Sequence, residues 1–154
     1  MILIVEDNVL IAMVIQDDLD RAGYDVVGPA ATNRAALDLV EQHEISLALV
    51  DIDLAEGDSG LDLARELSAK HSIPCLFVTG QTPDAISNAA AALGVLRKPF
   101  DGRQLLETVE TALAIAHEAA PVPEVEDESI PVTWFHASGA GSGANPTAAA
   151  ESGI

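Results

Sequence analysis

The sequence predicts an α/β protein in which five parallel strands form a doubly wound sheet with helices on both faces. Through residues 1–120, short apolar runs alternate with longer amphipathic stretches. The clearest runs are apolar at every position, which is typical of strands covered on both faces. This alternation implies a parallel sheet with right-handed crossovers. Hydrophobic residues make up 49% of the chain and aromatic residues 3%, so the expected core is aliphatic.

The strands are expected where an apolar run ends at a polar residue or a breaker. In chain order they are residues 2–5, 25–29, 47–51, 73–79 and 94–97. The helices are expected at residues 8–23, 32–43, 61–70 and 82–93, with a last one beginning at 101. Asn8, Thr32 and Asp101 are expected N-caps, because their side-chain oxygens can accept hydrogen bonds from free amides of the first turn. Pro83 suits a first helical position, and Gly23 suits a helix end.

Residues 121–154 have a different composition. They contain four prolines, no Lys or Arg, an acidic cluster at 124–128 and a stretch of Gly, Ala and Ser at 137–144. Such a segment buries too little apolar area to offset its ordering entropy, so we expect a mostly flexible tail. Residues 130–135 include the only tryptophan, Trp134. They either share the flexibility of the tail or dock on a surface, and the sequence leaves both readings open.

Charge and composition narrow the function classes. Seven Lys and Arg stand against 25 Asp and Glu, giving a formal charge of -18. Such a surface repels nucleic acid and anionic lipid, so we expect neither as a partner. The single cysteine, Cys75, allows no internal disulfide and no cysteine metal cage. No apolar run approaches the ~20 residues of a membrane span, and no secretion signal is recognisable, so we expect a cytoplasmic protein.

Several polar side chains follow the apolar strands directly. They are Glu6 and Asp7 after the first strand, Asp51 and Asp53 at the third, Thr79 at the fourth and Lys98 after the fifth. The carboxyl ends of parallel strands share one edge of the sheet, where ligand chemistry collects. Carboxylates brought close together need a counter-charge, and Mg²⁺ suits a site with few protein ligands, all of them oxygen atoms.

A nucleophilic Asp, metal-binding acids, a Lys and a Thr together suit phosphoryl transfer. The metal and the Lys neutralise the oxygens of the transferred group while the nucleophile is held in line. Attack by Asp on phosphorus forms an acyl phosphate. The sequence therefore predicts phosphoryl transfer to an aspartate.

In its order and spacing of motifs, the chain resembles the receiver domains of two-component response regulators over residues 1–118. The motifs are Val5-Glu6-Asp7-Asn8, Leu49-Val50-Asp51-Ile52-Asp53-Leu54, Phe77-Val78-Thr79-Gly80 and Lys98-Pro99-Phe100. The resemblance implies the flavodoxin-like receiver fold with strand order 2-1-3-4-5. It also implies a receiver domain over residues 1–120 and a separate tail over 121–154.

The resemblance also implies a role for each site residue. Asp51 would be the phosphoacceptor. Mg²⁺ would be bound by the side chains of Asp7 and Asp51, by the backbone carbonyl of Asp53, and by Glu6 through water. Thr79 would contact the phosphoryl group, and Lys98 would pair with Asp51 or the phosphoryl oxygens. The Lys98–Pro99 peptide bond is usually cis in this family.

The switch positions depart from the common pattern. Val95 occupies the place that often carries a switching aromatic residue, and the loop 54–60 lacks the usual proline. Phe77-Val78-Thr79-Gly80-Gln81 is similar to an aromatic-small-Thr-Gly signature of stand-alone regulators. The expected switch and interface residues are Gly80, Val95, Pro99 and Phe100.

The resemblance implies a histidine kinase or histidine phosphotransfer protein as donor and a downstream protein as target. It also allows a homodimer through the fourth helix, fifth strand and fifth helix. Two alternatives remain. One is a receiver-like binding module that works without phosphorylation, although Asp7, Asp51 and Lys98 are all present. The other is a haloacid-dehalogenase-like phosphatase, although those enzymes place their acidic pair after the Lys.

Overall fold

A computed structural model describes residues 1–82, 91–117, 121–123 and 131–135. Six strands form one sheet in the order β2-β1-β3-β4-β5-β6. The strands are β1 Ile2–Val5, β2 Val26–Ala30, β3 Leu47–Val50, β4 Cys75–Thr79, β5 Gly94–Arg97 and β6 Val132–Trp134. The first five pair in parallel, and β6 pairs antiparallel to β5. The predicted α/β fold with strand order 2-1-3-4-5 is confirmed, and β6 adds a sixth strand.

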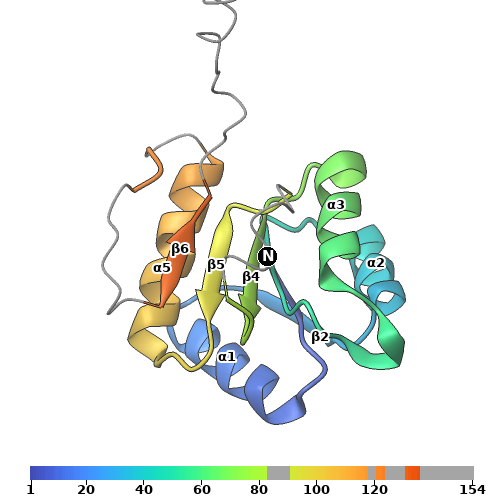
Figure 1. Cartoon of the computed structure of the whole chain (residues 1–154), viewed down its shortest axis with the longest axis horizontal. Helices are drawn as coiled ribbons and strands as arrows, with labels where there is room; N and C mark the ends of the chain where they lie inside the picture. Colours follow the sequence, from blue (N-terminus) through green and yellow to red (C-terminus); the bar gives the residue numbers. More distant parts are fainter. Residues whose placement is uncertain (83–90, 118–120, 124–130, 136–154) are drawn as a thin grey trace, which may run out of the picture.

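Helices pack on both faces of this sheet (Figure 1). They are α1 Val9–Arg21, α2 Asn33–Gln42, α3 Gly60–His71 and α5 Gly102–Ala116, with a short 3₁₀ helix, η1, at Ala55–Gly57. The predicted N-caps are confirmed. The side chains of Asn8, Thr32 and Asp101 accept hydrogen bonds from the first-turn amides of α1, α2 and α5. Each cap therefore fixes where its helix leaves the edge of the sheet.

Two hydrophobic clusters form the core, one on each face of the sheet. Leu3 and Val5 belong to the cluster that includes residues of α2 and α3. Ile2 and Ile4 belong to the cluster on the opposite face, which includes residues of α1 and α5. Successive strand residues point to opposite faces. A strand with both faces covered must therefore be apolar throughout, which is why β1 was recognisable.

The element ends differ in places from the sequence-based expectation. The helix expected at 82–93 lies largely outside the described residues, and residues 91–93 are a bend rather than a helix. Leu93 has already joined the sheet, because its N–H donates to the carbonyl of Cys75 at 2.8 Å. The fourth strand begins at Cys75 rather than at 73, because the Ile73 N–H donates to Leu67 and closes the end of α3.

Residues 131–135 lie on the sheet, at its β5 edge (Figure 1). Of the two readings left open, docking describes this segment. A strand of three half-buried residues gives too weak a pattern to be recognised in the sequence. The acidic cluster at 124–128 and the segment at 137–144, both expected to be flexible, lie outside the described residues.

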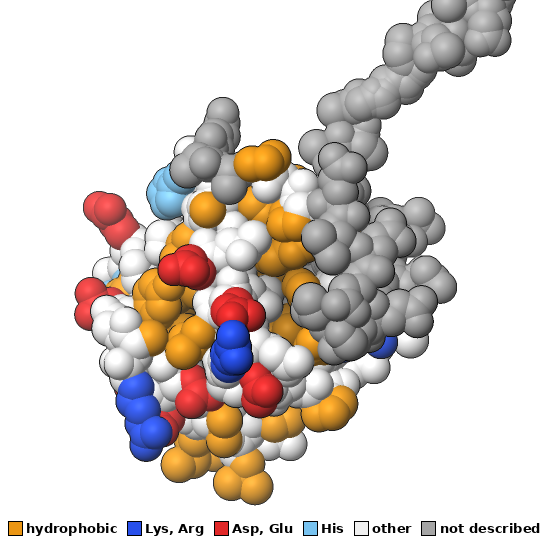
Figure 2. Space-filling model, turned by 90° about the vertical axis from the view of Figure 1, so that its left-hand side faces the viewer, with side chains coloured by type: hydrophobic (Ala, Val, Ile, Leu, Met, Phe, Trp, Pro, Cys, Tyr) orange, Lys and Arg blue, Asp and Glu red, His pale blue; other side chains and the backbone are white. Residues whose placement is uncertain are grey.

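Near the centre and the lower left of Figure 2, basic side chains lie beside acidic ones. Surface ion pairs include Arg21–Asp17 and Arg103–Glu107, both between residues four apart on a helix. Exposed pairs of this kind contribute little to stability. Among the helices that the structure describes, none combines the length and apolarity needed to cross a bilayer.

Candidate functional site

The ends of β1 and β3 bring the predicted acidic residues together. The two strands pair in register from Ile2–Leu47 to Val5–Val50, and the Asp51 N–H donates to the Val5 carbonyl at 2.9 Å. The residues that follow β1 therefore lie beside the residue that follows β3. Glu6, Asp7 and Asp51 each offer a carboxylate oxygen, and these oxygens lie within 4.8 Å of one another.

Lys98 reaches this acidic cluster from the end of β5. Its Nζ donates to Glu6 Oε1 at 2.7 Å and to Asp51 Oδ2 at 3.2 Å. The side chains of Glu6 and Asp51 are 2% and 9% exposed, and that of Lys98 is 20% exposed. The Lys98 N–H also donates to the Thr79 carbonyl at 2.8 Å, which fixes the backbone at the base of this side chain. One ammonium group thus bridges carboxylates from two different strand ends.

Burial and charge shift the pKa values of this ion pair. Burial raises the pKa of Glu6, and the negative charge of Asp51 adds to this, while hydrogen bonds from Lys98 and from the Asn8 N–H oppose it. Burial alone would lower the pKa of Lys98, but its hydrogen bond to Glu6 and the charges of Asp51 and Glu6 outweigh burial and raise it. Lys98 therefore remains charged at neutral pH and partly offsets the carboxylates around it.

Glu6 is held at both of its carboxylate oxygens. Oε1 accepts from Lys98, and Oε2 accepts from the Asn8 N–H at 3.1 Å. Asn8 also caps α1 by accepting from the amides of Leu10 and Ile11. The positive end of the α1 dipole consequently lies next to the acidic cluster, where it favours negative charge. Asp7 is the exposed member of the cluster.

Two loops meet over the outer side of the site. Gln81 Nε2 donates to both carboxylate oxygens of Asp53, at 3.1 and 3.2 Å. The Gln81 N–H donates to the hydroxyl of the fully buried Thr79 at 3.3 Å. Gln81 thus connects the loop after β4 to the loop after β3. Gln81 stands at the end of the fourth-strand motif, but its contact with Asp53 was not predicted from the sequence, since such a contact depends on loop conformation.

Gly60, the first residue of α3, controls how closely this helix approaches the phosphoacceptor position predicted at Asp51. A Cβ atom at Gly60 would lie 2.0 Å from the Asp51 carbonyl oxygen. The Gly60 N–H donates to the Ile52 carbonyl at 2.8 Å, and this hydrogen bond holds the start of α3 against the residues that follow β3. The sequence indicated only that Gly60 marks a loop.

The four expected switch positions differ in burial. Gly80 is exposed, Val95 is fully buried in a cluster with Phe77, and Phe100 packs against the α1 and α5 side of the core. The peptide bond between Lys98 and Pro99 is cis, as the family resemblance implied.

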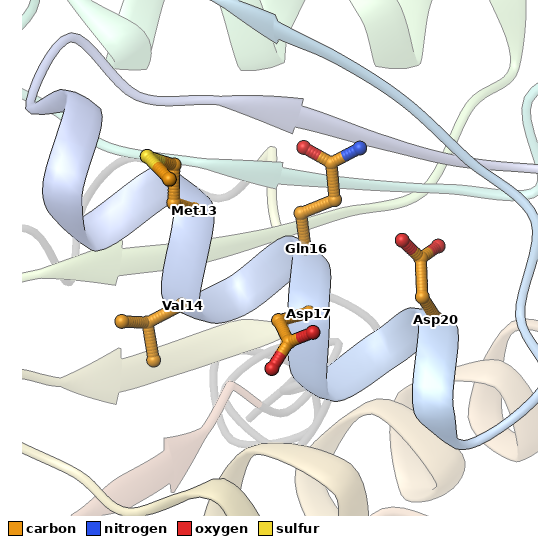
Figure 3. Close-up of a pocket in the computed structure, with 5 residues that line it drawn as sticks. All are labelled: Met13, Val14, Gln16, Asp17 and Asp20. Carbon is orange, nitrogen blue, oxygen red and sulfur yellow. The ribbon is translucent and has the colours of Figure 1, made fainter.

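A separate hollow of about 420 Å³ lies on the outer side of α1 (Figure 3). It is lined by the α1 residues Met13, Val14, Gln16, Asp17 and Asp20. None of the charged residues at the strand ends is among these five, so the hollow is distinct from the acidic site.

The profile of the response regulator receiver domain matches residues 2–110 of this sequence. The chain belongs to the response regulator receiver family. Receiver domains bind Mg²⁺ through an acidic pocket, and the cluster of Glu6, Asp7 and Asp51 has that chemical character. Membership of this family favours the receiver interpretation over the phosphatase-like alternative.

Two curated relatives illustrate the breadth of the family. This receiver is 33% identical over 116 residues to the transcriptional regulatory protein PdtaR of Mycobacterium tuberculosis, covering 73% of this chain and 56% of the relative. It is 32% identical over 120 residues to the phyllosphere-induced regulator PhyR of Methylorubrum extorquens, covering 77% of this chain and 45% of the relative. The receiver thus spans about half the length of these relatives.

Solved structures show the same fold. A CheY-like receiver domain protein from Methanospirillum hungatei superposes with a TM-score of 0.67 at 29% identity, covering 77% of this chain and 97% of the other. The chemotaxis regulator CheY4 of Vibrio cholerae gives a TM-score of 0.65 at 26% identity, covering 72% and 96%.

Proposed function

We propose that this receiver accepts a phosphoryl group on Asp51 from a phosphohistidine of a kinase or phosphotransfer protein and then signals through protein contact. The observation that carries the proposal is the position of the Lys98 ammonium between Glu6 and Asp51 at the strand ends. Glu6 and Asp51 are buried carboxylates that share one partly buried lysine, which is unlike the isolated acids of an ordinary surface. The arrangement supports a carboxylate that works beside a cation, as phosphoryl transfer requires.

The donor set also fits a hard divalent cation, because it consists of carboxylate oxygens within 4.8 Å of one another. Asp7 and Asp51 would bind Mg²⁺ by their side chains, Asp53 by its backbone carbonyl and Glu6 through water. When bound, the ion would neutralise charge on the phosphoryl oxygens. The remaining chemistry is assigned to residues of the chain.

In the proposed step, a carboxylate oxygen of Asp51 attacks phosphorus and forms an acyl phosphate. The nitrogen–phosphorus bond of the donor breaks, and its electron pair stays on the imidazole nitrogen, which takes up a proton. Lys98 holds one Asp51 oxygen at 3.2 Å before the reaction, and its charge favours the incoming phosphoryl oxygens. Thr79 supplies a hydroxyl that turns from the Gln81 amide toward the phosphoryl group.

Water then hydrolyses the acyl phosphate slowly, which returns Asp51 to its carboxylate form. The receiver therefore promotes both its own phosphorylation and its own dephosphorylation, and the duration of the signal depends on the lifetime of the phosphorylated form. The cytoplasmic location expected from the sequence remains a prediction.

The surface next to the site supports docking of a protein donor. Val9, Leu10, Met13 and Val14 are 59–74% exposed on α1, the helix that begins beside Asp7. A contiguous exposed apolar patch of this kind is typical of an interaction surface, whereas single exposed apolar side chains are not. We assign it to the donor, because a protein seated there lies next to the phosphoacceptor.

Incubation with acetyl phosphate and Mg²⁺ tests the central step. Mass spectrometry of the intact protein is expected to show one added phosphoryl group, which Asp51→Asn abolishes. Asp62→Asn makes the same change at an exposed α3 residue and serves as the matched control. Labelling that persists in Asp51→Asn would refute the assignment.

A phosphohistidine-carrying phosphotransfer protein tests the donor surface. Leu10→Lys is expected to slow transfer from this protein while leaving labelling by acetyl phosphate unchanged, because Leu10 is exposed and lies outside the acidic cluster. Equal rates with the protein donor before and after substitution would remove α1 from the proposal.

A further inference from the structure

Residues 131–135 extend the sheet beyond β5 by strand pairing. The register matches Gly94 with Trp134, Val95 with Thr133 and Leu96 with Val132. Backbone hydrogen bonds close both ends of the pair. The Arg97 N–H donates to the Pro131 carbonyl at 2.6 Å, and the Phe135 N–H donates to the Leu93 carbonyl at 2.8 Å. The whole length of β5 is thus paired on this side by the chain's own tail.

Side chains of this segment pack on both faces of the sheet. Val132 and Trp134 pack against the cluster that contains residues of α1 and α5. Phe135 packs against the cluster on the opposite face, which contains Val95. The segment therefore covers the apolar edge of the core on both sides as well as pairing with β5.

Gly94 gives independent evidence that this contact is built into the sequence. A Cβ at Gly94 would lie 2.5 Å from the Thr133 carbonyl oxygen and 3.0 Å from the Trp134 Cα. All of the nearest atoms belong to the tail strand, and the φ of Gly94 lies outside the left-handed region. The backbone conformation at Gly94 is therefore open to other residues, and the closest obstacle to a side chain is β6 itself.

The two alternative sheet edges differ in their tendency to pair with another chain. Without β6, the edge would be β5, a strand of four residues whose first three are buried while β6 is in place. With β6, the edge is a strand of three half-buried residues that follows Pro131. Unpaired apolar edges are templates for strands of other molecules, whereas short edges next to proline are poor ones.

We propose that residues 131–135 form an internal cap strand, which occupies the β5 edge of its own chain and prevents that edge from pairing with a second copy. A homodimer through the fourth helix, fifth strand and fifth helix, which the family resemblance allows, then requires release of the cap. This proposal does not depend on phosphoryl transfer, and its test needs no donor.

The full-length Gly94→Ala variant tests the cap, with Gly102→Ala as the matched control. At Gly102 the three atoms nearest to the new Cβ all belong to the carboxylate end of Asp18, which can move aside. In the wild-type protein we expect Trp134 emission to be blue-shifted from that of free tryptophan, with a monomer in sedimentation velocity. Gly94→Ala is expected to shift the emission to the red and to produce concentration-dependent dimers, whereas Gly102→Ala matches the wild type.

Thr133→Pro is the second variant, because it alters only the tail strand and removes a backbone donor opposite Val95. It is expected to reproduce both effects of Gly94→Ala even if that substitution perturbs the domain. Three results would each overturn the proposal. The first is Trp134 emission typical of water-exposed tryptophan in the wild-type protein. The second is that Gly94→Ala and Thr133→Pro both behave like the control. The third is a red shift of Trp134 emission in these variants while sedimentation velocity shows that they stay monomeric.

Discussion

Lys98 joins three strand ends through one residue. Its ammonium group contacts Glu6 after β1 and Asp51 after β3, and its backbone amide contacts Thr79 at the end of β4. Removing one partner from a buried ion pair leaves the remaining charges desolvated and uncompensated. The stability of the unphosphorylated protein should therefore depend on this side chain.

We expect Lys98→Met to lower the free energy of unfolding at pH 7 by about 2–3 kcal/mol, which is less than the roughly 3–5 kcal/mol of a fully buried pair because the ammonium is partly exposed. Urea unfolding measures this change. The matched control is Lys70→Met, which removes an exposed lysine whose ammonium lies 3.8 Å from Glu66. A loss in Lys98→Met no larger than that in the control would contradict the expectation.

We also expect Lys98→Met to change how the free energy of unfolding depends on pH. The pKa of Glu6 is raised in the folded protein. The contribution of Glu6 to the free energy of unfolding is therefore fully present below the ordinary pKa of 4.5 and is lost as pH rises through the pKa of the folded protein. Lys98 opposes this raised pKa, and the total fall should therefore be larger in Lys98→Met and extend to higher pH. The stability due to the raised pKa of Lys98 itself is present below 10.5 and is lost as pH rises through the folded value, a loss that the variant lacks. Parallel curves for the two proteins would argue against this coupling.

Residue by residue, the sequence allowed the charged cluster to be predicted because each member follows an apolar strand directly. The carboxyl ends of parallel strands lie at one edge of the sheet, so the convergence of Glu6, Asp7 and Asp51 could be predicted without knowing the conformation of any loop. The contact between Gln81 and Asp53 was missed, because both residues lie on loops whose conformations the apolar pattern does not determine.

At the scale of elements, α3 is seated against the end of β3 through a glycine. We expect Gly60→Ala to lower the free energy of unfolding by about 1–3 kcal/mol, the usual cost of overpacking a tight site. The Asp51 carbonyl and the loop behind it must shift to admit the new methyl group. Labelling of Asp51 by acetyl phosphate is therefore expected to slow.

Urea unfolding and the rate of labelling together check this prediction. Gly102→Ala places the same methyl group at the first residue of α5, against the end of a flexible side chain. Gly60→Ala with the stability and labelling rate of that control would show that the approach of α3 to β3 is less tight than described.

Strand positions were more predictable than helix ends and edges. The strands β1 and β3 are buried at every residue, so their composition alone marks them. The prediction that the helix extends to residue 93 was wrong at residues 91–93. There the Leu93 N–H donates to the Cys75 carbonyl, and no side-chain pattern in the sequence indicates such a backbone hydrogen bond. Strand β6 was not predicted as a strand because its three residues are only half-buried.

At the scale of the whole molecule, electrostatic repulsion sets the response to metal. The chain carries a formal charge of -18, and three of its carboxylates converge at the strand ends. A cation that binds the folded state stabilises it by mass action. Mg²⁺ at ten times its dissociation constant would add about 1.4 kcal/mol, which corresponds to a rise of several degrees in melting temperature.

Thermal unfolding with MgCl₂, against NaCl at equal ionic strength, measures this effect and separates binding from general screening. Asp7→Asn is expected to weaken the Mg²⁺ response, whereas Asp17→Asn, at an exposed α1 residue, is expected to retain it. Equal melting curves in the two salts would count against a metal site at the strand ends.

The glycine beneath the tail strand has an evolutionary consequence. Glycine and alanine codons differ at a single nucleotide, so a point mutation at position 94 would suffice to expose the last strand of the parallel sheet. No insertion, deletion or loss of the tail is needed. Homologous genes that retain the tail but encode a larger residue at this position should therefore specify proteins with a different assembly state.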